Sequence, residues 1–178
     1  MKLSAMRLRQ RDGVTCGPSV AIVAGALLDP RYGAQLAPDG VAVAGDVQKW
    51  FSGEQGRVHR EVNLIWPRAL GTTPSGMARA LTVHSEPRGV RYRWRNFRGR
   101  RDGLSDVRDA VGGGWPVAML VGNFIPRHWV LLVDTAGEAF GCYEPSSGAV
   151  RAVNAEAIRH ARLTGVGFPR PFAFVLPA

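Results

Sequence analysis

The chain contains little cysteine, almost no lysine and no long hydrophobic run. The first and the last of these absences each exclude a class of protein. Its two cysteines, Cys16 and Cys142, are too few for a disulfide framework and lack the paired spacing of cysteine-rich zinc sites. We expect both thiols to be reduced, which predicts a cytoplasmic protein. A single bridge between them is the alternative.

The longest apolar run, residues 19–28, is shorter than the ~20 residues that span a bilayer. It follows a basic start, as the core of a secretory signal does, but Asp12 and a Gly-Pro pair interrupt the approach and no A-x-A-like cleavage site follows. We therefore expect no membrane partner; a secretory signal, whose cleavage would remove Cys16, is the alternative. Since we find no repeats, low-complexity tracts or linkers, we expect a single domain over residues 1–178.

The charge is strongly positive, with a net value of +9 at pH 7. Arginine supplies 21 of the 23 cationic residues, and a surface of this sign favours an acidic partner. Abundant arginine with little lysine is also typical of GC-rich genomes, so coding bias explains part of the charge. Net charge bears on solubility and partners rather than on fold.

Three helices are expected in the first half of the chain. They cover residues 16–28, 47–51 and 72–84. The first tolerates Pro18 in its opening turn and ends before Asp29, because the residue preceding a proline is pushed out of helical geometry. The third opens with Thr73 as its cap and Pro74 as its first residue.

The second half is expected to consist mainly of strands. Expected strands cover residues 90–95, 115–122, 127–134, 139–145, 149–153 and 172–177, and short helices cover 105–111, capped by Ser105, and 155–163. Helices followed by a meander of strands indicate an α+β fold, with an antiparallel sheet packed against helices.

An arginine-rich stretch, residues 88–101, carries seven arginines interleaved with aromatic residues. Tyr92 and Trp94 alternate with arginines at the period of a half-buried strand, so both rings are expected to face inward. Exposed aromatic rings among arginines bind single-stranded nucleic acid, but inward rings remove the stacking platform. We expect a solvated arginine face; an acidic peptide or other anionic partner is the first alternative and nucleic acid the second.

Cys16 is the candidate nucleophile. A thiol attacks as its thiolate, and a free cysteine with a pKa of ~8.5 is mostly protonated at neutral pH. A helix N-terminus and a neighbouring imidazolium both favour the thiolate, and Cys16 opens a predicted helix. Cys142 lies within a predicted strand and is expected to be structural.

His128 is the best candidate for the imidazole among the four histidines, because it begins the apolar segment "HWVLLV". Its orienting acid is expected on the neighbouring strand. If the hairpin turns about residues 136–137, residue 128 faces residue 145, and if the loop is one residue shorter or a bulge intervenes, it faces residue 144. Glu144 is therefore the candidate acid, since Asp134 lies on His128's own strand at roughly 20 Å.

Gln10 lies six residues before Cys16, and its amide is the candidate partner of the Cys16 N–H in an oxyanion hole. Three segments now stand in order: Q-R-D-G-V-T-C-G-P-S, R-H-W-V-L-L-V-D and Y-E-P-S-S-G. Together they resemble the papain-like cysteine peptidases of the bacteriocin-processing type, the C39-like family. The resemblance is local and leaves residues 30–114 unmatched in detail.

The resemblance implies a bacterial enzyme with a papain-like fold. In it Gln10 builds the oxyanion hole, Cys16 attacks, His128 acts as base and Glu144, the acid before a proline, orients the imidazole. Glu144 stands where the family has aspartate. The chain also lacks the transporter and transmembrane segments of bacteriocin-processing members, so a stand-alone domain is expected.

The expected reaction is hydrolysis of a peptide or amide bond through an acyl-enzyme, with no metal and no organic cofactor. An acyltransferase or transglutaminase-like enzyme would use the same site with an amine as acceptor. A non-catalytic papain-like module that binds through the arginine-rich stretch is the alternative from another class.

Overall fold

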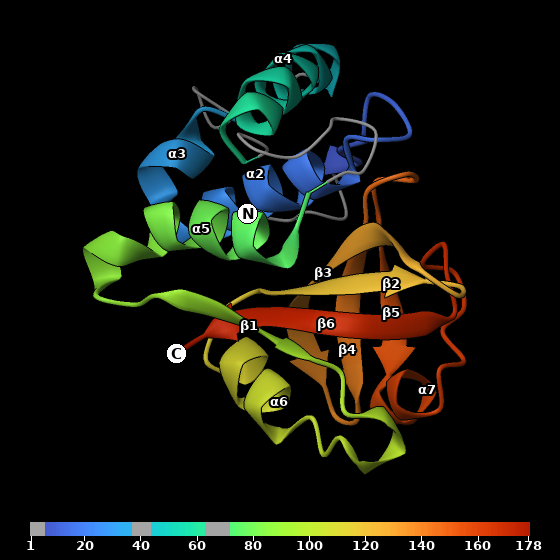
Figure 1. Ribbon diagram of the computed structural model, residues 1–178. Coiled ribbons are helices and arrows are strands. Elements are labelled where there is room, and N and C mark those ends of the chain that lie inside the picture. The colour runs from blue at the N-terminus through green and yellow to red at the C-terminus, as the bar shows by residue number, and fades with distance from the viewer. Residues whose placement is uncertain (1–5, 37–43, 63–71) are drawn as a thin grey trace.

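The computed structural model describes residues 6–36, 44–62 and 72–178. It shows the expected α+β architecture, with the N-terminal helices packed on one face of a six-stranded antiparallel sheet and two short helices on the other (Figure 1). The helices are α2 (Cys16–Leu28), α3 (Pro30–Ala34), α4 (Ala44–Val62), α5 (Pro74–Ser85), α6 (Ser105–Gly112) and α7 (Ala155–Arg159), with 3-10 turns η2 (Glu86–Arg88) and η3 (Gly99–Arg101).

The sheet has the strand order β1-β6-β2-β3-β4-β5. The strands are β1 (Tyr92–Asn96), β2 (Val117–Gly122), β3 (Pro126–Ala136), β4 (Ala139–Glu144), β5 (Ala149–Asn154) and β6 (Arg170–Pro177). Strands β2 to β5 form the expected meander. The last strand, β6, inserts between β1 and β2, so the C-terminal segment lies inside the sheet rather than at its edge.

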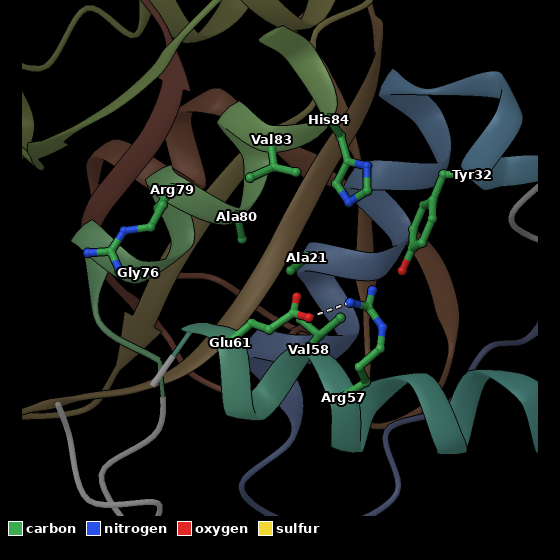
Figure 2. A pocket seen from close by; sticks show the side chains of 10 residues that line it. All are labelled: Ala21, Tyr32, Arg57, Val58, Glu61, Gly76, Arg79, Ala80, Val83 and His84. Carbon is green, nitrogen blue, oxygen red and sulfur yellow. Dashed lines mark hydrogen bonds and ion pairs between the residues drawn. The ribbon is translucent and has the colours of Figure 1, made fainter. Parts of the chain in front are cut away.

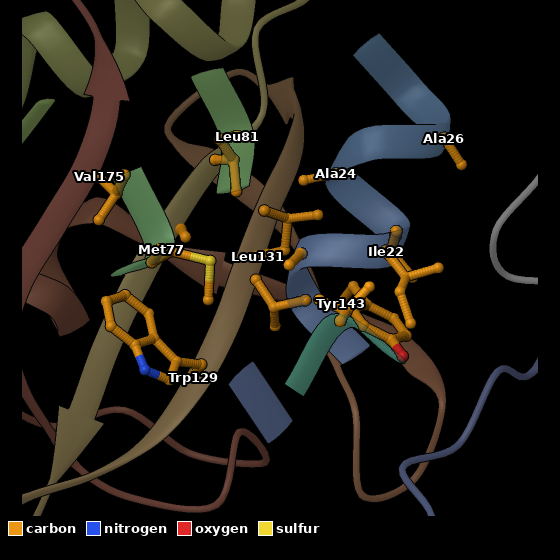
Figure 3. Packing of buried hydrophobic residues seen from close by; sticks show 14 of the residues in the cluster. Ile22, Ala24, Ala26, Met77, Leu81, Trp129, Leu131, Tyr143 and Val175 are labelled. Atoms are coloured by element: carbon orange, nitrogen blue, oxygen red, sulfur yellow. The ribbon is translucent and has the colours of Figure 1, made fainter. Parts of the chain in front are cut away.

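Helix α2 lies at the centre of the helical layer and packs against α4, α5 and β3. Its side chains are buried almost all round, as its nearly continuous apolar sequence requires. Figure 3 shows Ile22 of α2 and Met77 of α5 in the same cluster as Trp129 and Leu131 of β3. This packing fixes the start of α2 relative to the sheet.

Helix α5 begins as predicted, because the Thr73 hydroxyl accepts a hydrogen bond from the Gly76 N–H at 3.1 Å. Helix α6 does not: Ser105 is its first helical residue, and Leu104 occupies the cap position with φ 54° and no side-chain cap. Helix α7 ends at Arg159 rather than at residue 163, since Ala161 has a φ of 54° that no α-helix continues.

Helix α4 is the largest correction, since it spans 19 residues where only 47–51 was predicted. Its buried apolar stripe consists of Val47, Phe51 and Val58, which is thin for a helix of this length. Three glycines, Gly45, Gly53 and Gly56, interrupt the segment and lower its helix propensity. Packing against α2, which the local sequence does not show, stabilises the full helix.

The arginine-rich stretch differs from its predicted orientation. Tyr92 is buried as expected, but Trp94 is 45 % exposed. Arg95 is turned inward instead and donates to Asp102 at 2.7 Å and to Asp106 at 2.6 Å. β1 is the edge strand of the sheet, and Arg95 is paired with two carboxylates where it turns inward. The alternation of aromatic residues and arginines in the sequence therefore did not predict which side chains are buried.

Within the described ranges, no helix combines the length and the apolar composition that crossing a membrane requires.

Candidate active site

Cys16 is the first residue of α2 and is buried, with 4 % of its surface exposed. The Ser19 N–H donates to the Thr15 carbonyl at 2.9 Å, so the Cys16 and Gly17 N–H groups lie in the first turn, before the intrahelical bonds begin. The Thr15 side chain does not cap these groups. Cys16 therefore combines a thiol with backbone donors and the positive end of a helix.

A residue larger than glycine at position 17 would clash with Thr72. A Cβ atom at this position would meet the Thr72 hydroxyl oxygen at 2.2 Å and Trp129 Cδ1 at 3.4 Å. The indole of Trp129 in turn donates to the Thr72 carbonyl at 2.8 Å. The segment before α5 and the strand that carries His128 are thus packed directly against the start of α2.

His128 and Glu144 form a buried pair in which His128 Nε2 lies 3.0 Å from Glu144 Oε1. The hairpin register that joins them differs from the predicted one. Leu131 faces Tyr143, and continuing this register places Glu144 opposite Val130, two residues from His128. The contact is therefore a diagonal one, at a separation that long side chains reach.

The Glu144 carboxylate is held by the turn that follows it. The Ser146 N–H donates to Oε1 at 2.7 Å and the Ser147 N–H donates to Oε2 at 2.9 Å. Burial alone would raise the pKa of Glu144, but the bonds from His128 and these serines outweigh it and lower the pKa to about 2. Glu144 is a fixed anion with its remaining lone pairs directed at the imidazole.

His128 interacts with two side chains: its Nε2 lies 3.0 Å from Glu144 Oε1, and the Cys16 side chain contributes to the raised pKa of its imidazole. Since Nε2 is occupied by Glu144, Nδ1 is the nitrogen left for the sulfur. Burial alone would lower the pKa of His128, but its interactions with Cys16 and Glu144 outweigh this effect and raise the pKa to about 9. The imidazole is thus an imidazolium at neutral pH, next to the thiol.

The ring of His128 is also enclosed from the loop before β6. A Cβ atom on Gly167, whose φ is 86°, would lie 3.2 Å from His128 Cδ2. The Phe168 ring centroid lies 5.9 Å from that of His128. The sequence did not predict either residue. Nothing in the segment "GFP" indicates that this loop packs against a histidine some forty positions earlier in the chain.

Gln10 reaches the site through its backbone, because its N–H donates to the Pro145 carbonyl at 2.8 Å, directly after Glu144. Its side-chain Nε2 donates to the Asp12 carbonyl at 2.8 Å, which leaves one of its two amide hydrogens for another acceptor. The structure therefore brings together Cys16, His128 and Glu144 by side-chain contacts, and it joins Gln10 to the turn of the acid.

Cys142 lies elsewhere in the core. Both cysteines are free thiols, so the alternative of a bridge between them is wrong. Cys142 is fully buried in the cluster below the sheet, and burial raises the pKa of its thiol. Cys142 is thus a matched control for any experiment on Cys16.

A separate hollow lies between α2, α3, α4 and α5 (Figure 2), and its lining contains none of the four candidate residues. Four of the polar side chains that line it or border it, Tyr32, Arg57, Glu61 and His84, have partners within the chain. Tyr32 donates to Glu54 at 2.7 Å, Arg57 is paired with Glu54 and Glu61, and the His84 ring stacks on Tyr32 with centroids 4.3 Å apart. These contacts join the helices to one another.

Neither a metal-binding cluster nor a match to a known protein identifies the function of this site. Among the residues that the structure describes, no three His, Cys, Asp or Glu side chains are grouped so that they hold a metal ion. No known family model matches the chain, and no curated protein matches its sequence.

The pKa shift of His128 predicts how stability depends on pH. Its pKa is raised from 6.5 to about 9, so the native state binds this proton more tightly than the unfolded chain does. The resulting stabilisation is complete below pH 6.5 and is lost as the pH rises through about 9. Urea unfolding of wild type and His128→Phe at pH 6 and pH 10 measures it. We expect the difference in unfolding free energy to shrink at pH 10, and an equal difference at both values would contradict the shift.

Proposed function

We propose that the chain is a papain-like cysteine peptidase that hydrolyses a peptide or amide bond through an acyl-enzyme on Cys16. The observation that carries the proposal is the grouping of Cys16, His128 and Glu144: the imidazole is hydrogen-bonded to the acid and interacts with the thiol, the thiol opens a helix, and the acid is held by its own turn. The α+β architecture, a nucleophile-bearing helix on an antiparallel sheet, is consistent with the proposal.

Acylation begins with the thiolate of Cys16 and the imidazolium of His128. The sulfur attacks the substrate carbonyl carbon, an S–C bond forms, and the C=O π pair moves to the oxygen. The Cys16 N–H and the Gln10 amide are the donors for this oxyanion. When the intermediate collapses, the C–N bond breaks and His128 gives its Nδ1 proton to the leaving amine.

Deacylation reverses the proton transfer. A water molecule gives a proton to His128 while its oxygen attacks the thioester carbonyl, and collapse breaks the S–C bond and restores the thiolate. Glu144 stays ionised throughout, because its pKa is about 2, and stabilises each imidazolium that forms. An amine in place of this water would make the enzyme an acyltransferase with the same residues.

The proposal is tested with p-nitrophenyl acetate at pH 7. We expect release of p-nitrophenolate with an acetyl group found on Cys16, and not on Cys142, by peptide mapping of the quenched protein. Cys142→Ala is expected to keep the activity and Cys16→Ala to lose it. Product analysis with added glycinamide separates hydrolysis from transfer, since acetylglycinamide would form only if an amine is accepted.

One outcome opposes the enzyme proposal altogether. If p-nitrophenolate release is the same in Cys16→Ala and wild type, Cys16 is not a nucleophile. A binding role of the arginine-rich stretch 88–101, with Trp94 half-exposed on it, would then be the better hypothesis.

A further inference from the structure

The backbone on either side of Gln10 is held by two glutamines of α4. Gln48 makes a reciprocal pair of bonds with Arg9: its Oε1 accepts from the Arg9 N–H at 3.1 Å, and its Nε2 donates to the Arg9 carbonyl at 3.0 Å. Gln55 bridges two residues, since its Nε2 donates to the Arg9 carbonyl at 3.1 Å and its Oε1 accepts from the Arg11 N–H at 2.8 Å.

The backbone of residues 9–11 is thus hydrogen-bonded to two different parts of the chain. Arg9 and Arg11 bond to α4 on one side, while the Gln10 N–H bonds to the Pro145 carbonyl on the other. Further along, the Arg9 side chain donates to the Ser147 carbonyl at 3.0 Å. The same short segment therefore connects α4 to the turn that carries Glu144.

Gln48 and Gln55 are seven residues apart, so two helical turns place them on one face of α4. Gln55 has no exposed surface, which is unusual for a glutamine. Each of its bonds uses an amide group with the correct polarity, a donor for the carbonyl and an acceptor for the N–H. Helix α4 packs on α2 and α5, so these amides extend its contacts to the catalytic segment.

We propose that Gln55, assisted by Gln48, is a positioning residue for the oxyanion hole: it fixes the backbone of Arg9 and Arg11 and thereby sets where the Gln10 amide stands relative to Cys16. This inference rests on the proposed function. It assigns to α4 a part in catalysis without contact between α4 and the substrate. Small displacements of an oxyanion donor lower its stabilisation of the transition state.

The test compares two reactions of the same sulfur. Acylation by p-nitrophenyl acetate needs both the thiolate and the oxyanion hole, whereas alkylation by iodoacetamide needs the thiolate alone. In Gln55→Met, which removes both hydrogen bonds at nearly constant volume, we expect acylation to slow by about tenfold, a part of the 10²–10³ that losing an oxyanion donor costs. Alkylation of Cys16 is expected to keep its wild-type rate.

A double-mutant cycle with Gln10→Ala separates positioning from general support of the fold. If Gln55 acts through Gln10, Gln55→Met slows acylation of the Gln10→Ala protein by less than about twofold. The same tenfold loss in both backgrounds would overturn the proposal. Lys49→Met, at an exposed position of the same helix, is the control and is expected to match wild type.

A second variant and the wild-type result complete the test. Gln48→Met, at a half-buried position where water can replace the amide, is expected to show a smaller loss in the same direction, and it serves if Gln55→Met does not fold. No selective loss of acylation in either variant would also overturn the positioning role. If wild-type Cys16 is not acylated at all, the proposed function fails first, which is a different result.

Discussion

Replacement of His128 by alanine is expected to lower turnover of p-nitrophenyl acetate by about 10⁴-fold or more, the order of the loss when one member of a catalytic triad is removed. In the proposed mechanism, the variant lacks the proton donor for the leaving group and the base for the attacking water. It also removes the imidazolium that interacts with the Cys16 side chain. Both acylation and deacylation are therefore expected to slow.

The chain offers a matched control for this variant. His160 also pairs with a glutamate, since its Nε2 lies 2.7 Å from Glu156 Oε1, but this pair is partly exposed on α7. His160→Ala is expected to leave turnover unchanged. Equal losses in the two variants would show that removal of a His–Glu pair, and not of the catalytic imidazole, caused the effect.

Glu144→Gln is expected to lower turnover by about 10²- to 10³-fold, since the triad acid stabilises the imidazolium that forms in each cycle. The interactions with Cys16 and with Glu144 together raise the pKa of His128 to about 9, and an amide keeps the size of the Glu144 side chain but removes its charge. We therefore expect the upper pH limit of activity, near 9 in wild type, to move down. Turnover measured from pH 5 to pH 10 gives both quantities.

The control is Glu138→Gln, at the opposite end of the same hairpin, where the side chain is exposed and paired with Arg108. It is expected to leave both turnover and the upper pH limit unchanged. An unshifted limit in Glu144→Gln would mean that Glu144 does not set the protonation of His128.

Glu144→Asp distinguishes this site from the family pattern. Aspartate is usual at this position in the family that the sequence resembles, yet we expect it to lower turnover here by roughly 10-fold or more. The reason is the diagonal register, in which Glu144 faces Val130 and must reach two residues along β3 to His128. An aspartate that matches wild type would show that the turn adjusts to the shorter side chain.

The sequence predicted those parts of the fold that depend on local patterns. The apolar run after Cys16, the Thr73-Pro74 helix start and the meander of strands β2 to β5 carry their signal within a few residues, and these elements are found close to the expected positions. The length of α4 and the place of β6 inside the sheet depend on contacts between distant segments. The local sequence pattern predicts neither of these features.

The register of the β3–β4 hairpin shows the limit most clearly. The turn is centred one residue later than expected, because Ala136 pairs with Ala139 and Gly137 takes a φ of 60°. An irregularity between Leu132 and Asp134 then shifts the ladder, where the Asp134 carboxylate lies against Gly141. The pairing of His128 with Glu144 was anticipated, but its diagonal geometry was not.

Residues that act through backbone contacts were not predicted at all. Gln48 and Gln55 have ordinary positions on a polar helix, and only the folded chain brings them to Arg9 and Arg11. Ser146 and Ser147 support the Glu144 carboxylate through N–H groups, which every residue except proline has. Sequence patterns reveal side-chain chemistry far better than backbone donors.

The measurement that tests the central claim most directly is the rate at which iodoacetamide alkylates Cys16 at pH 7, in wild type and in His128→Ala. A free thiol is only slightly ionised at this pH, so loss of the neighbouring imidazolium is expected to slow alkylation of Cys16 by about tenfold or more. Cys142, buried below the sheet, is expected to stay unlabelled in both proteins. Equal rates for Cys16 in the two proteins would show that His128 does not activate this sulfur.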